Sequence, residues 1–206
     1  MRVPTTTLAI ETAIGGGSVS LLRSDRNDIC TLEGVSRAED LLISIDRLLA
    51  ECQTSLDELD TIAVSLGPGS FTGIRIGIAT AIGLRMSLSA KCVGVSALEA
   101  INLSCPDENI VAVVPLGRGH FAFQEFWRDD ASRGPTVVNE GELIETFGRR
   151  SDIKVLVCTE GEWSPPANFT VCTDPVSTLI GRCALAGRGT EDLRPLYLRN
   201  QGQQTI

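Results

Sequence analysis

A glycine-rich turn is the part of the sequence whose residue types and spacing are best suited to chemistry. It spans residues 67–77, reads G-P-G-S-F-T-G-I-R-I-G, and directly follows the apolar run Thr61–Leu66. A strand that ends in glycines and opens into a helix leaves the first N–H groups of that helix without intrahelical partners. Such a turn can bind a phosphate or receive a neighbouring backbone carbonyl, and the sequence leaves both alternatives open.

The turn differs from three glycine motifs whose spacing it approaches. A P-loop ends in Lys followed by Ser or Thr, whereas Phe71 precedes Thr72 here. A dinucleotide fingerprint reads G-x-G-x-x-G, but the third glycine of this turn comes one residue late. A nucleophile elbow needs glycines two residues to either side of its serine, and Pro68 and Thr72 occupy those positions around Ser70.

The whole undecapeptide resembles the G-P-G-S-F-T-G-x-R-x-G signature of the TsaB (YeaZ) family, whose members serve the formation of threonylcarbamoyladenosine in tRNA. Three further segments resemble that family in the same order along the chain, at residues 8–12, 93–98 and 196–200. The resemblance implies a duplicated α/β fold of the actin-like (ASKHA, RNase H-like) class, with two lobes whose mixed sheets are flanked by helices. We predict an N-terminal lobe over residues 1–104 and a smaller C-terminal lobe over residues 105–206.

Composition is that of an ordinary globular protein. Of the 206 residues, 43% are hydrophobic and 21% are charged, which suffices for one large domain or two small lobes. The formal charge of −8 works against autonomous RNA binding, which needs a basic surface. No apolar stretch reaches the roughly 20 residues of a membrane span, and the N-terminus lacks the apolar core of a signal peptide. We expect a cytoplasmic protein that meets tRNA only indirectly, through a partner.

Cysteine and histidine usage argues against a metal site. Seven cysteines without a C-x-x-C pair are typical of reduced, mostly buried thiols. His120 is the single histidine, which excludes metal sites with two histidines and leaves one candidate base for a Ser-His-Asp triad. We interpret His120 as a strand residue beside a turn.

Hydrophobic periodicity predicts the same order of elements twice, a hairpin, a helix, a strand and a helix. The first half begins with strands 5–10 and 18–22 around Gly15-Gly16-Gly17, followed by a helix that has a Ser36/Glu39 capping box and ends at Cys52. A single short turn with a Ser55/Glu58 capping box comes next. Strand 61–66, helix 72–88, strand 92–95 and a short helix capped by Ser96 and Glu99 complete this half. In the second half they are strands 110–116 and 121–127, helix 140–150, strand 153–158 and a helix with Asp174 at N-cap and Pro175 at N1.

The resemblance also indicates where a nucleotide would bind in active members of the actin-like class, which end the first strand with Asp. Glu11 stands at that position and is one methylene longer. Leu116-Gly117-Arg118 stands where family members commonly carry Asp-Ala-Arg, so that a carboxylate is lost. We predict possible anion-binding or nucleotide-binding residues at Glu11, Gly15, Gly16, Gly67, Gly69, Ser70 and Arg118, and Arg118 is equally well explained as an exposed loop residue.

The resemblance implies that family members pair with a catalytic paralogue or with themselves. They would do so through the signature helix and the amphipathic helix before it. This chain lacks the paired histidines that bind the paralogue's metal. We predict that both helices contribute to the interface, through Ile43, Ile45, Leu49, Gly73, Ile74, Arg75, Gly77, Ile78 and Ala81. The stripe Gly73, Gly77 and Ala81 could instead pack on the chain's own sheet, which is the default for glycine-bearing helices.

Two functional hypotheses follow. The first is a non-catalytic scaffold that binds and activates the TsaD-type threonylcarbamoyl transferase acting on adenosine 37 of tRNA. It would hold no tightly bound cofactor, with ATP or ADP, Mg²⁺ and a TsaE-type ATPase belonging to the assembled complex. The second is a stand-alone nucleotide-dependent enzyme of the actin-like class, an ATPase or a kinase-like protein.

Overall fold

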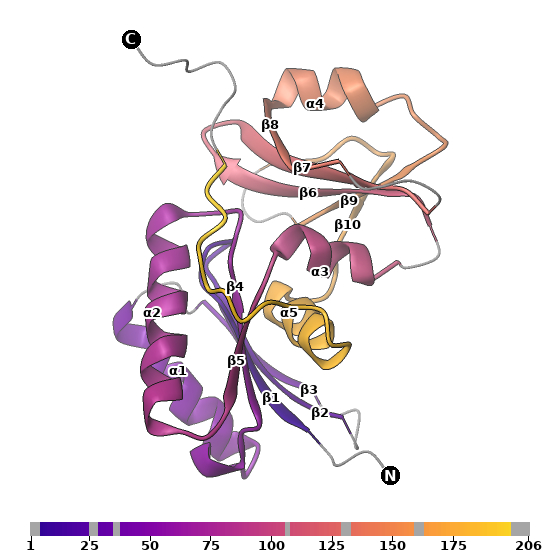
Figure 1. Cartoon of the computed structure of the whole chain (residues 1–206). Coiled ribbons are helices and arrows are strands. Elements are labelled where there is room, and N and C mark those ends of the chain that lie inside the picture. The colour runs from indigo at the N-terminus through magenta and orange to yellow at the C-terminus, as the bar shows by residue number, and fades with distance from the viewer. Residues whose placement is uncertain are drawn as a thin grey trace.

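Two five-stranded mixed sheets form the framework of the molecule (Figure 1). The computed structural model describes residues 5–24, 29–34, 38–105, 108–128, 133–158 and 163–198. The first sheet has the order β3-β2-β1-β4-β5. Its strands are β1 (Thr6–Glu11), β2 (Ser18–Arg23), β3 (Ile29–Glu33), β4 (Thr61–Ser65) and β5 (Lys91–Val95).

The second sheet repeats the first in order and direction. Its order is β10-β9-β6-β7-β8, and in both sheets the first strand lies antiparallel to the second and parallel to the fourth. The duplicated actin-like α/β fold is thereby confirmed. The strands are β6 (Ile110–Gly117), β7 (His120–Phe126), β8 (Thr136–Asn139), β9 (Lys154–Val157) and β10 (Phe169–Val171).

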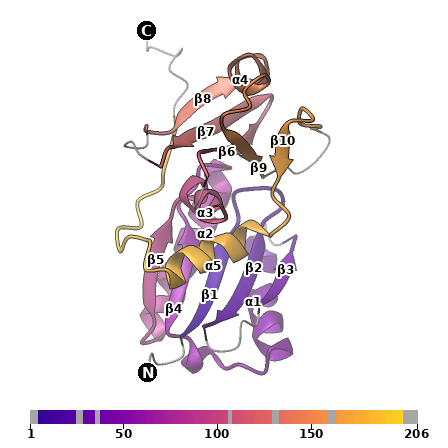
Figure 2. The same ribbon diagram turned by 90° about the vertical axis from the view of Figure 1, so that its right-hand side faces the viewer.

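Helices cover both sheets in layers. The first sheet carries α1 (Ala38–Glu51) and α2 (Phe71–Ser87) on one face, while α5 (Val176–Leu185) packs on the other (Figures 1 and 2). Helix α3 (Ala97–Leu103) lies between the lobes and contacts both α5 and β6. Helix α4 (Glu140–Phe147) packs on β7 and β8 of the second sheet. A short 3-10 turn, η1, spans Leu56–Glu58. Among the described helices, none is both long and apolar enough to cross a membrane.

The chain returns to its first half after the second sheet is complete. The hydroxyl of Ser20 on β2 lies 2.6 Å from that of Ser177 and 3.0 Å from that of Thr178, both on α5. Further on, Thr190 forms an antiparallel bridge with Gly94 of β5. The first sheet ends with Val95 and the second begins with Ile110, while α5 packs on the first sheet, and the division between residues 104 and 105 stays a prediction.

Local signals placed most elements, but some details differ. The Ser55/Glu58 capping box is confirmed, while Ser36 lies outside the described residues. Ser96 occupies the N-cap of α3, yet its side chain makes no capping hydrogen bond, so the predicted cap was wrong in its chemistry. Pro175 is the N-cap of α5, one residue after the predicted Asp174, whose carboxylate instead forms an ion pair with Arg182.

Candidate functional site

The glycine-rich turn at the start of α2 is filled by the chain's own backbone. Ser70 is the N-cap residue, and its N–H donates to the carbonyl of Ala13 at 2.8 Å. The hydroxyl of Thr12 donates to the carbonyl of Gly73 at 2.7 Å. The sequence allowed either a phosphate or a backbone carbonyl at the N-terminus of this helix. In the structure the carbonyl of Ala13, just after β1, lies there.

Glycine is required at this contact because the two segments approach so closely. A Cβ added to Gly69 would lie 2.6 Å from the Ala13 carbonyl oxygen, and one added to Gly73 would lie 2.0 Å from that of Thr12. Gly67 has φ of +92°, a conformation that L side chains rarely adopt. The signature glycines of this chain thus serve the packing of the turn after β1 against α2.

The Thr12 hydrogen bond yields a prediction with an internal control. Thr12→Val should lower the free energy of unfolding by about 1 kcal/mol, because the Gly73 carbonyl loses a buried hydrogen-bond donor while the shape of the side chain is kept. Thr7 is also buried, but its hydroxyl has no hydrogen-bond partner among the described residues. Thr7→Val should therefore be neutral or stabilising. Urea denaturation of both variants tests this, and equal losses of stability would contradict it.

The Glu11 carboxylate forms hydrogen bonds within the turn that follows β1. Its side chain is 1% exposed, and one carboxylate oxygen accepts hydrogen bonds from the N–H groups of Ala13 and Ile14 at 2.5 and 2.9 Å. The turn then reverses through Gly15 and Gly16, both at positive φ, into β2. The carboxylate at the end of β1 therefore shapes the hairpin.

A small acidic cleft lies between the two lobes. Its volume is about 210 Å³, less than the roughly 300 Å³ at which typical ligand pockets begin. Its charged lining residues are Glu11, Glu33 and Asp174, and among the described residues no lysine or arginine lines it. Asp174 is paired with Arg182, and the negative charge of Glu11 and Glu33 disfavours a phosphate in the cleft. The full lining is Glu11, Gly15, Gly17, Ser18, Glu33, Gly34, Cys158, Cys172, Thr173, Asp174, Pro175 and Val176.

The structure brings only part of the predicted anion site together. Glu11 and Gly15 line the cleft, Gly16 sits at the tip of the same turn, and Gly67, Gly69 and Ser70 form the contact with Ala13. Arg118 lies in the β6–β7 turn with φ of +54° and is not part of the cleft lining. His120 begins β7 beside that turn, as predicted, and its Nδ1 lies 3.0 Å from the Arg118 carbonyl oxygen. The described residues contain no cluster of three metal-ligating side chains.

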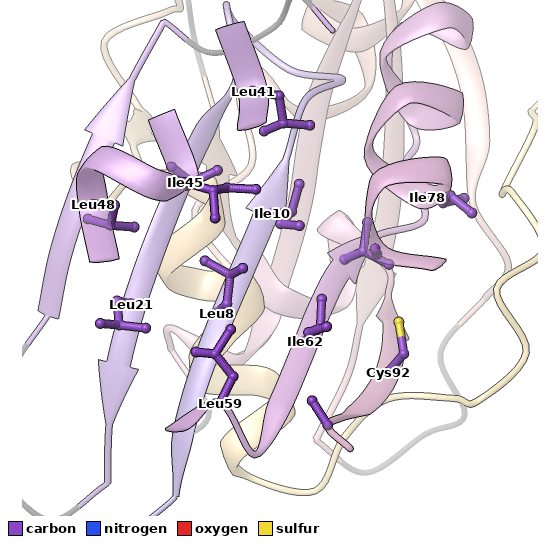
Figure 3. Packing of buried hydrophobic residues seen from close by; sticks show 14 of the residues in the cluster. Leu8, Ile10, Leu21, Leu41, Ile45, Leu48, Leu59, Ile62, Ile78 and Cys92 are labelled. Carbon is purple, nitrogen blue, oxygen red and sulfur yellow. The ribbon is translucent and has the colours of Figure 1, made fainter. Parts of the chain in front are cut away.

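The helical layer buries most of the residues predicted to meet a partner. Ile45 on α1 and Ile78 on α2 belong to one core cluster with the first sheet (Figure 3). The same cluster contains Leu49 on α1 and Ile74 and Ala81 on α2. Gly73 and Gly77 are buried as well, and a Cβ at Gly77 would lie 2.6 Å from the hydroxyl of Thr12. The small-residue stripe therefore packs on the chain's own sheet, which was the alternative reading. Of the nine predicted residues, only Ile43 and Arg75 are exposed.

A second apolar face of α2 points to solvent and was not predicted from the sequence. Phe71, Ile82 and Met86 are exposed, and with Arg75 they recur at spacings of 4, 7 and 4 residues on one side of the helix. We call these four residues the outward face of α2. Their helical spacing, on the side opposite Gly73 and Gly77, was the signal available in the sequence.

The N-terminal end of this outward face is braced by the C-terminal segment. The guanidinium of Arg75 lies 3.7 Å from the centre of the Phe71 ring, and its Nε donates to the Tyr197 hydroxyl at 3.0 Å. The rings of Phe71 and Tyr197 are 4.8 Å apart. Cation–π and ring contacts of this kind hold exposed side chains in one arrangement. On α1, Leu42 and Ile43 add exposed apolar side chains to the same helical layer.

Comparison with known proteins assigns the family. The chain is 31% identical over 230 aligned positions to the tRNA threonylcarbamoyladenosine biosynthesis protein TsaB of Escherichia coli, with 94% of each chain covered. The chain belongs to the TsaB family. TsaB of Haemophilus influenzae is also 31% identical, over 75% of this chain and 64% of that protein. Shorter matches occur too, and the chain spans 42% of an uncharacterized protein of Mycobacterium leprae.

Two further comparisons agree with this assignment. The model of the TsaD family, described as tRNA N6-adenosine threonylcarbamoyltransferase, matches residues 35–126, a segment that runs from α1 through α2 to the end of β7. The structure of YeaZ from Pseudomonas aeruginosa superposes with a TM-score of 0.67 at 22% identity, covering 94% of this chain and all of that one. The TsaB family member therefore shares a fold with YeaZ and a sequence relationship with the transferase family, consistent with a role in threonylcarbamoyladenosine biosynthesis.

Proposed function

We propose that this TsaB family member is a non-catalytic subunit that binds and activates a TsaD-type threonylcarbamoyl transferase. The observation that carries the proposal is the outward face of α2, where Phe71, Ile82 and Met86 are exposed on a helix whose other side is already buried. Exposed apolar side chains gathered on one face are typical of protein interaction sites. Gly83 lies on the exposed side with open space around it, which would let a second helix approach.

The cleft supports the non-catalytic part of the proposal. A nucleotide needs positive charge or a bound divalent cation to offset its phosphates. The cleft instead offers Glu11, Glu33 and Asp174, and the Glu11 carboxylate already accepts two backbone hydrogen bonds. We therefore propose that ATP or ADP, Mg²⁺ and a TsaE-type ATPase act in the assembled complex, and that tRNA is contacted there.

Size-exclusion chromatography with light scattering tests the scaffold directly. The chain would be run alone and then mixed with the TsaD-type transferase of the same organism. We expect a 1:1 complex to replace the free species, including any homodimer of this chain. Absence of a complex at both low and moderate salt would overturn the proposal.

Titration calorimetry tests the competing hypothesis of a stand-alone nucleotide-dependent enzyme. We expect ATP with Mg²⁺ to give no binding heat at micromolar protein, because the cleft is small and acidic. The same titration of the mixture with the transferase is the matched experiment. Tight binding and turnover by the isolated chain would favour the enzyme instead.

A further inference from the structure

Two cysteines on neighbouring strands meet at the interlobe cleft. Cys158 directly follows β9, and Cys172 directly follows β10. These strands are parallel with Val157 opposite Val171, so the two cysteines are the next pair in the same register. The N–H of Cys172 donates to the Val157 carbonyl at 2.9 Å, which continues the pairing to this point. Both cysteines line the cleft.

The register suits a disulfide. Neighbouring strands lie about 4.8 Å apart, within the roughly 4.4–6.8 Å between Cα atoms that a disulfide spans. Residues directly opposite each other also point to the same face of a sheet. A side-chain hydrogen bond from Cys158 lowers the pKa of the Cys172 thiol. Cys172 is half-buried and faces the cleft, so a small oxidant can reach it.

We propose that Cys158 and Cys172 form a peroxide-sensitive thiol pair that closes to a reversible disulfide. The Cys172 thiolate attacks one oxygen of hydrogen peroxide, whose O–O bond breaks, and the products are a sulfenic acid and hydroxide. The Cys158 sulfur then attacks the sulfenic sulfur, so that the S–S bond forms and the S–O bond breaks. The departing hydroxide and the thiol proton leave as water. In sum, two thiols and one peroxide give one disulfide and two waters, and a thiol reductant reverses the reaction.

A second cysteine pair provides an internal comparison. Cys30 on β3 and Cys52 after α1 are also in hydrogen-bond contact, and both are half-buried. There, burial together with the hydrogen bond to Cys30 raises the pKa of Cys52 to about 12. Because the thiolate is the reacting form, Cys52 should react with peroxide more slowly than Cys172.

The disulfide would act on the segment that joins the lobes. Cys172 begins the segment through Thr173 and Asp174 that leads from the second sheet to α5, which packs on the first sheet. Linking Cys172 to the end of β9 would hold that segment against the second sheet where it lines the cleft. Oxidation would thereby restrain the point at which the chain leaves β10 toward α5.

Mass spectrometry of the full chain tests the proposal. The reduced protein is exposed to one equivalent of hydrogen peroxide, alkylated at intervals and digested without reduction. We expect a peptide linked through Cys158 and Cys172 to form at least about tenfold faster than one linked through Cys30 and Cys52, and to disappear with dithiothreitol. A faster Cys30–Cys52 link, or over-oxidation of Cys172 without any disulfide, would overturn the proposal.

Cysteine variants separate the oxidation of Cys172 from the disulfide formation by Cys158. Cys172→Ser should remove the fast loss of free thiols, whereas Cys52→Ser, the control from the other pair, should leave it. In Cys158→Ser, Cys172 should stop at the sulfenic acid, which dimedone traps. Unchanged fast oxidation in Cys172→Ser would show that another thiol reacts first. The wild-type experiment stands by itself if a variant fails to fold.

Discussion

Gly73→Ala is expected to destabilise the protein by about 3 kcal/mol, the upper end of the usual cost of overpacking a core. The added Cβ would lie 2.0 Å from the carbonyl oxygen of Thr12 and 2.8 Å from the Cα of Ala13. Both are backbone atoms of the turn after β1, so relief requires moving that turn away from α2. The movement would also break the hydrogen bond from Thr12 to Gly73. Urea denaturation followed by circular dichroism measures the free energy of unfolding.

Gly83→Ala on the same helix is the matched control. A Cβ at Gly83 meets no atom within 4 Å, and alanine is favoured over glycine in a helix by up to about 1 kcal/mol. We expect this variant to be more stable than the parent chain. If the two variants had the same stability, the close contact between α2 and the turn would be disproved.

Gly77→Leu is expected to impair folding of the chain. If Gly77 lay at a partner interface, this variant would lose its partner and stay folded. Because a Cβ at Gly77 would meet the Thr12 hydroxyl at 2.6 Å and Val64 at 3.4 Å, we expect the core to be disrupted. Loss of partner binding in this variant would therefore say nothing about an interface.

The second large effect is expected at the outward face of α2. Met86 is 82% exposed, and Met86→Glu combined with Ile82→Glu should weaken binding to the transferase by at least about 30-fold, the effect of losing one interface hot spot of about 2 kcal/mol. The charged side chains would have to be desolvated in the complex. Because both positions are open to solvent in the free chain, the free energy of unfolding should change by no more than about 0.5 kcal/mol. Titration calorimetry with the transferase measures the affinity.

Ile144 provides the control for this variant. It is 38% exposed on α4, in the second lobe and away from α2 (Figure 1). Ile144→Glu should bind the transferase as the parent chain does. If Ile144→Glu weakened binding and the double variant did not, the interface would lie on the second lobe and the proposed surface would be rejected.

The sequence by itself determined the elements whose signals are local. Leu41, Ile45 and Leu48 recur at helical spacing and lie on the buried side of α1, and the hairpin glycines separate β1 from β2 as expected. The capping box of Ser55 and Glu58 involves residues three apart and formed as predicted. The family signature and the order of its landmarks gave the fold class. Interactions within a few residues are encoded where they occur, so pattern reasoning finds them.

Three short strands could not be found in this way. β3, β8 and β10 have five, four and three residues and lack the buried apolar run by which the equally short β4 and β9 were predicted. Each lies at or near a sheet edge and is specified by the neighbouring strand that pairs with it. Their existence depends on a partner that is distant or unrecognised in the sequence.

Only the tertiary structure decided how α2 and the cleft are used. Isoleucines occur on opposite sides of α2, for example Ile76 and Ile78, so periodicity did not identify which face meets the sheet. Likewise, the Ala13 carbonyl reaches the start of α2 across more than fifty residues, and strand pairing brings Cys158 opposite Cys172. These outcomes depend on the register and packing of segments far apart in the chain, which local residue patterns do not specify.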